Sequence, residues 1–268
     1  MIYADKKSAL VRLTDSLKVT LDSCAETAAD VLEIYRRNKT GLDRLREVAA
    51  MVAQEKAPFS DLEKANAAIP PNEAQAGGYL QVRLHGQALA GVLLSCFCLE
   101  SYINSLAYFL FGEADYLGLS RKRHQASANA ILDAIERMTA RAKWDFVGGL
   151  GRDAGFDKSR PPYQDFDVLF RFRDDHVHDK MRDLSEDFGE KRYRGKLPDP
   201  VSGLLHLHHA LFGAEAYWAM VLEVHRLLDL EPQRFHHLYN LTPWRDEPGR
   251  ARLRDVARQY QDAGVLGP

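Results

Sequence analysis

Apolar side chains recur at helical spacing through the first 52 residues of the chain. They fall at positions 17, 21, 24, 28, 31, 35, 42, 45, 49 and 52, which is a 4-3 pattern with one polar gap at Asn38. Thr40 with Asp43 resembles an N-cap with a helper carboxylate, and Gly41 lowers helix propensity, so one long helix and two stacked helices both fit. The small residues in the stripe favour packing on the protein's own domain over an independent coiled coil.

Proline and glycine divide the rest of the chain. Residues 57–78 contain Pro58, Pro70, Pro71 and the pair Gly77-Gly78, which predicts a connection. Further helices are expected over residues 81–111, 125–146, 163–184 and 201–230, and one short exposed helix over residues 248–263. The sequence therefore predicts an all-α, antiparallel helical bundle over residues 81–230, preceded by a helical arm (1–80) and followed by an Arg-rich tail (231–268).

The overall charge is close to balance. Lys and Arg number 36 against 38 acidic residues, which gives a net charge of -2. A nucleic-acid partner would therefore have to be bound by a local patch and not by the whole surface. Arg outnumbers Lys by 24 to 12, and guanidinium groups suit fixed contacts with carboxylate or phosphate.

Three cysteines and a charged N-terminus indicate a reducing, cytoplasmic setting. Cys24, Cys96 and Cys98 are odd in number and lack C-x-x-C spacing, so neither a disulfide framework nor a zinc knuckle is expected. The N-terminus has no signal-peptide core. Glu100 interrupts the most apolar stretch, 88–111, which is interpreted as a buried helix, so no membrane partner is expected.

Ionisable groups are concentrated near the end of the helix expected over residues 163–184. Seven charged or imidazole side chains occur between positions 173 and 180, which would be costly to bury unless they were paired. Asp174 and His178 are four residues apart and about 40° apart around a helix, so the carboxylate can orient the imidazole. Arg173 and His178 lie about 140° apart, so they could flank a ligand or meet across a two-fold interface.

The stretch Arg173-Asp-Asp-His-Val-His178 resembles the Arg-x4-His motif of the HEPN superfamily of helical bundles. The upstream segment with Glu100 and Asn104 resembles the apolar helix that faces this motif in the family. The resemblance covers roughly residues 81–230. It implies a homodimeric, metal-independent RNA endonuclease with a composite site, in which Arg173 neutralises the scissile phosphate and His178 is the acid or base. A toxin or phage-defence role, with a protein partner or antitoxin, is also implied.

Two departures from the family pattern affect this interpretation. Asp174 stands where Asn is common, and Asp175 adds a second negative charge, which opposes RNA binding unless the carboxylates orient His178 or pair with Arg171. Lys180 stands where a toxin subset has a modified Tyr. The alternative is a non-catalytic HEPN-like scaffold that binds a nucleotide, an RNA or a protein.

The remaining candidates are weaker. His176 is a further supporting residue, and the loop with Lys191, Arg192, Arg194 and Lys196 could bind a flexible RNA strand, although such loops are more often merely solvated. Metal binding by the histidines is not expected, because no inward Glu-x-x-His pair accompanies them. His206 and His209 are three residues apart and share a helix face, and their expected role is packing or hydrogen bonding near the dimer interface. No cofactor is expected.

Overall fold

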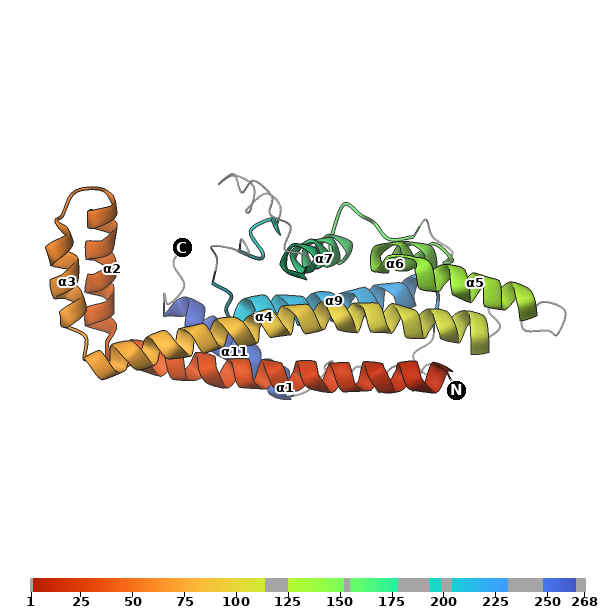
Figure 1. The fold of residues 1–268 in the computed structure, drawn as a ribbon, viewed down its shortest axis with the longest axis horizontal. Coiled ribbons are helices and arrows are strands. Elements are labelled where there is room, and N and C mark those ends of the chain that lie inside the picture. Colours follow the sequence, from red (N-terminus) through yellow and green to blue (C-terminus); the bar gives the residue numbers. More distant parts are fainter. Residues whose placement is uncertain are drawn as a thin grey trace.

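Two long antiparallel helices form the spine of the molecule. α1 (Ile2–Arg37) and α4 (Pro71–Tyr108) lie side by side along its long axis, as Figure 1 shows. The computed structural model describes residues 2–113, 125–151, 155–177, 193–198, 204–230 and 248–263. Within those ranges every regular element is a helix, so the predicted all-α helical bundle is confirmed.

The first apolar stripe is buried along α1, and its positions beyond α1 are more exposed. Its six positions on α1 are all buried, namely Leu17, Leu21, Cys24, Ala28, Val31 and Tyr35. α1 ends before Asn38, whose side-chain amide donates to the carbonyl oxygen of Ile34 at 3.0 Å. α2 (Lys39–Ala53) begins at the next residue and rises away from the spine (Figure 1). The sequence allowed either one long helix or two stacked helices here, and the structure has two separate helices.

The segment 57–78 is not a simple connection, which corrects the prediction from its prolines and glycines. It contains α3 (Phe59–Ala67), which packs against α2, and the first turns of α4. Pro71 is the first residue of α4, where a missing N–H costs no hydrogen bond. Gly77 and Gly78 lie inside α4, because packing of the helix outweighs the propensity cost of about 1 kcal/mol for each glycine. The proposed boundary at residue 80 therefore falls within a continuous helix.

α4 is the central helix of the bundle. By length and composition alone, residues 71–111 would suffice to cross a membrane, but 56% of their most apolar window is buried inside the protein, as in a core helix. A short π-helical turn, η1 (Phe109–Glu113), follows it. Burial of this helix agrees with the interpretation of residues 88–111 as a core element.

The next apolar segment forms two helices and not one. α5 (Gln125–Arg137) and α6 (Ala140–Gly148) are separated at Met138 and Thr139. Thr139 caps α6, because its hydroxyl oxygen accepts the backbone N–H of Ala142 at 3.3 Å. This cap is the local reason for the break within the expected helix over residues 125–146.

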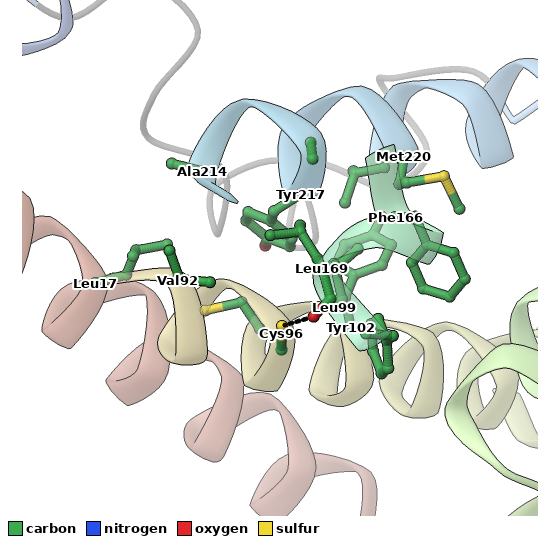
Figure 2. Packing of buried hydrophobic residues seen from close by; sticks show 14 of the residues in the cluster. Leu17, Val92, Cys96, Leu99, Tyr102, Phe166, Leu169, Ala214, Tyr217 and Met220 are labelled. Atoms are coloured by element: carbon green, nitrogen blue, oxygen red, sulfur yellow. Dashed lines mark hydrogen bonds between the residues drawn. The ribbon is translucent and has the colours of Figure 1, made fainter. Parts of the chain in front are cut away.

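α7 (Tyr163–Val177) and α9 (Leu207–Leu227) complete the core against α4. Figure 2 shows Phe166 and Leu169 of α7 packed among side chains of α4 and α9. The thiol of Cys96 donates to the carbonyl oxygen of Leu169 at 3.5 Å, which joins α4 to α7. The expected continuation of α7 to residue 184 lies outside the described residues. The helix expected over residues 201–230 starts at Leu207.

α11 (Pro248–Asp262) is present where a short helix was expected, but one of its faces is buried. Leu253, Ala257 and Tyr260 are buried, and the helix packs on α1 and α9. Arg254 binds Glu215 of α9 at 2.7 Å. The tail therefore belongs partly to the bundle, because its Leu and Tyr follow the 3.6-residue period.

Candidate functional site

Arg173 is held at the solvent edge of the core by contacts on several sides. Its Nη1 donates to Oε2 of Glu100 on α4 at 3.1 Å. Its Nε and Nη2 donate to Oδ1 of Asp174 at 3.1 and 2.8 Å. The guanidinium carbon lies 4.4 Å from the centroid of the Phe170 ring. These contacts fix the plane of the guanidinium group.

The local sequence explains how α7 presents Arg173 in this way. Phe166, Leu169, Phe170 and Phe172 are buried and anchor the helix in the core. Arg173 follows directly, with 19% of its side chain exposed, while the side chain of Glu100 is 40% exposed. The charged group thus lies where the apolar face of α7 meets solvent, which avoids the full cost of burying a charge.

The hydrogen-bond capacity of Arg173 is not exhausted by its carboxylates. A guanidinium carries five N–H donors. Glu100 and Asp174 together take three of them. Two donors are therefore left over in the part of the chain that the structure describes, and one fixed phosphate or carboxylate oxygen can accept each of them.

Asn104 does not join Glu100 at Arg173. Its side-chain oxygen accepts a hydrogen bond from Nζ of Lys143 on α6 at 2.8 Å. Lys143 is only 5% exposed, so this bond serves a nearly buried cation between two helices. Lys143 was not predicted as a site residue, although a lysine beside Trp144 in an amphipathic segment is a signal that could have identified it.

Arg171 and His176 are engaged along α7 itself. Arg171 Nη2 lies 2.5 Å from Oδ2 of Asp167, so the ion pair described for Arg171 differs from the expected one with Asp174 or Asp175. His176 Nδ1 lies 3.3 Å from the carbonyl oxygen of Phe172, and the two rings are 4.1 Å apart. Both residues are on the motif helix, but neither has a contact with Arg173 among those described.

The basic loop is only partly described. Lys196 is paired with Asp165 of α7, and its ammonium lies 5.5 Å from the centroid of the Phe212 ring. Arg194 is exposed, and the adjacent Tyr193 is buried and donates its hydroxyl to Asp175. Lys191 and Arg192 lie outside the described residues, as does His178, the expected acid or base.

His206, just before α9, packs with His208 and His209 of its first turn. His206 and His208 have ring centroids 6.0 Å apart, and those of His208 and His209 are 3.7 Å apart. His209 Nδ1 accepts the backbone N–H of His206 at 2.9 Å at the start of the helix. Across the described residues, no group of three or more His, Cys, Asp or Glu side chains is arranged to hold a metal ion.

In comparisons with protein-family models, curated proteins and solved structures, nothing matched this chain. The HEPN resemblance therefore depends on the residues of the motif and on the helical bundle around them.

Proposed function

We propose that this protein is an HEPN-like, metal-independent RNA endonuclease that acts as a homodimer. The observation that supports the proposal is the guanidinium of Arg173, which two carboxylates and an aromatic ring hold in one orientation while two N–H donors remain among the described contacts. A fixed cation of this kind stabilises charge that develops on a phosphate without reorganising during the reaction.

The proposed reaction is a transfer within the RNA strand. The ribose 2′-oxygen attacks the adjacent phosphorus and forms a new O–P bond, while the bond from phosphorus to the 5′-oxygen breaks. One imidazole accepts the 2′-hydroxyl proton, and a second donates a proton to the 5′-oxygen. We assign these roles to His178 of the two copies. The products are a 2′,3′-cyclic phosphate and a 5′-hydroxyl.

A non-catalytic scaffold is the second candidate, and the charge around Arg173 favours it. Glu100 and Asp174 place two carboxylates on one guanidinium, which leaves a local charge of about -1. Asp175 is the next residue on the same helix and adds a further carboxylate. A phosphate would meet repulsion from these groups unless they reorient, whereas a purely structural bridge between α4 and α7 would not.

Cleavage of mixed single-stranded RNA in EDTA separates the two functions. The wild-type protein should yield fragments with 2′,3′-cyclic phosphate ends, and Arg173→Lys and His178→Ala should each reduce the rate at least 100-fold. Lys keeps the charge but lacks the planar fork, so Arg173→Lys tests orientation with the least damage to the fold.

Arg160→Ala is the matched control, because Arg160 is an exposed Arg just before α7 and forms an ion pair with Asp157, three residues earlier in the chain. Its cleavage rate should equal that of the wild type. Absence of cleavage, or cleavage that persists in both motif variants, would exclude the nuclease proposal and leave the scaffold.

A further inference from the structure

Three large apolar side chains of α4 are exposed instead of lying in the core. Tyr79, Val82 and Phe97 are 68%, 70% and 41% exposed. Ala90 and Leu93, which lie between them along the helix, are half-buried. On an α-helix these five positions fall within a sector of about 80°. They form one row along the surface of the helix, the α4 stripe.

The core residues of α4 lie on another side of the helix. Val92, Leu99 and Tyr102 are buried, and Figure 2 shows all three among the packed side chains of the core. A surface helix of a single bundle is typically apolar on its core face only. The α4 stripe is a second apolar face, which indicates a second packing partner.

The exposed apolar area is what one side of a stable protein–protein interface needs. Leu204, which is 52% exposed, adds to the stripe, because the next residue donates its backbone N–H to His85 of α4 at 2.8 Å. With Tyr79, Val82 and Phe97 it exposes apolar surface on the order of 500 Å². A standard interface buries about 800 Å² on each partner, of which about 450 Å² is non-polar.

The α4 stripe leads directly to the Arg173 site. Glu100 follows Phe97 by three residues in the same sector of the helix, and its 40% exposed side chain binds Arg173. A partner that covers the stripe therefore also reaches the edge of this site. The proposed cleavage needs two copies of the chain at one site, so a second copy is the partner that fits both features.

The position of Glu100 decides the direction in which two α4 helices pack. The middle of the stripe is at residue 88, twelve residues before Glu100. In an antiparallel pair centred there, the two Glu100 residues would be about 36 Å apart along the helices. Two Arg-x4-His motifs could not then act on one phosphate. Parallel helices in register instead bring both Arg173–Glu100 bridges to the same level.

We propose that the α4 stripe is the homodimer interface, with the α4 helices of two copies parallel and in register along a two-fold axis. In such an isologous interface each stripe residue meets its own counterpart near the axis. This inference rests on the proposed nuclease function, because that function requires two copies at one site.

Sedimentation velocity with charge variants tests the interface. Val82→Glu places two carboxylates opposite each other at the axis, so it should weaken dimerisation at least 100-fold and lower RNA cleavage in proportion to the dimer fraction. Tyr79→Glu is a second variant with the same expected effect. Val19, on α1, is 67% exposed. Val19→Glu is therefore the matched control and should leave the dimer dissociation constant within threefold of the wild type.

Disulfide cross-linking tests the parallel register. The three native thiols are buried, and burial raises the pKa of each to about 12, so an introduced surface thiol reacts selectively. Oxidation by dissolved oxygen with copper phenanthroline should join two Val82→Cys chains into a covalent dimer. Val19→Cys should stay monomeric in a denaturing gel under the same conditions.

Three results would overturn the interface, provided that circular dichroism shows each variant to be folded. They are a wild-type protein that is monomeric at the concentration of the cleavage assay, a dimer that Val82→Glu and Tyr79→Glu leave intact, and no covalent dimer of Val82→Cys. A dimer that meets these expectations without cleaving RNA would exclude the nuclease and support the interface. RNA cleavage by a monomeric protein would exclude the interface alone.

Discussion

At the scale of single residues, the bridge between Arg173 and Glu100 connects α7 to α4. Both the catalytic and the structural hypothesis predict this contact, so its presence does not separate them. Its energetic value can be measured independently of function, because the two side chains lie on different helices and are 19% and 40% exposed.

A double-mutant cycle with Arg173→Met and Glu100→Gln should give a coupling free energy of about 1 kcal/mol, since a partly exposed pair is weakened by solvent. Urea unfolding of the four proteins measures it. The exposed pair Arg44–Glu47, with side chains 64% and 60% exposed, serves as the control and should give about 0–0.5 kcal/mol. Equal values for the two pairs would mean that the bridge does not lock the helices.

The three thiols should be unreactive in the folded protein. Cys24, Cys96 and Cys98 are buried, and burial raises the pKa of each to about 12. At pH 8 the thiolate fraction is then on the order of 10⁻⁴, and the reagent also lacks access. Reaction with Ellman's reagent should be at least 100-fold slower in buffer than in concentrated urea. One rapidly labelled thiol in the native protein would contradict the buried packing of α1 and α4.

At the scale of elements, the crossing of α4 and α9 depends on small side chains. A Cβ atom at Gly91 would lie 2.9 Å from the Cβ of Ala210 on α9, closer than real side chains approach. Gly91 permits the two helices to come together, whereas Gly86, five residues earlier and exposed, has open space around its Cβ position. Glycine therefore favours the packing of α4 at position 91, whereas at position 86 it only lowers the helix propensity of α4.

Gly91→Ala should therefore destabilise the protein by about 1–3 kcal/mol through overpacking. Gly86→Ala should stabilise it by about 0.5–1 kcal/mol, because alanine favours the helix and meets no neighbour. Thermal or urea unfolding measures both changes. Effects of the same sign would show that α9 does not lie against Gly91 as described.

At the scale of the whole molecule, several buried histidines make stability depend on pH. Burial lowers the pKa of His208 and His225 to about 4 and that of His209 to about 2. At His208 and His209 the neighbouring imidazoles lower the pKa further. The unfolded chain binds these protons near pH 6.5. Between pH 6.5 and pH 4 the unfolded state therefore holds more protons than the folded state, and stability falls with acidification.

The expected loss between pH 7 and pH 5 is on the order of 1 kcal/mol for each of the three histidines. Urea midpoints measured across this range should fall steadily. His225→Gln should reduce the number of protons taken up on unfolding by about one, because it removes one imidazole that is protonated only in the unfolded chain. The slope of unfolding free energy against pH should fall accordingly. A midpoint that stays constant from pH 7 to pH 5 would contradict the neutral, packed state of these imidazoles.

The comparison of sequence with structure shows which features are local. Three features follow from residues within a few positions of one another: the stripe over α1, the cap at Thr139 and the start of α4 at a proline. The cap and the start of α4 were not predicted. Periodicity could be read directly for α1 because its buried residues lie on one face of the helix, which is turned mainly toward α4. The candidate Arg173–Glu100 contact could also be anticipated, since charges inside an apolar helix need partners.

The sequence by itself determined an all-α protein, the burial of the α1 stripe and the segment that carries Arg173. Only the tertiary structure decided that α4 continues through Gly77 and Gly78, that Asn104 serves Lys143, and that the α4 stripe is exposed. The physical reason is that helix periodicity is encoded by near neighbours, whereas helix continuity across glycine, the partners of a polar side chain and the exposure of an apolar one depend on residues distant in the chain.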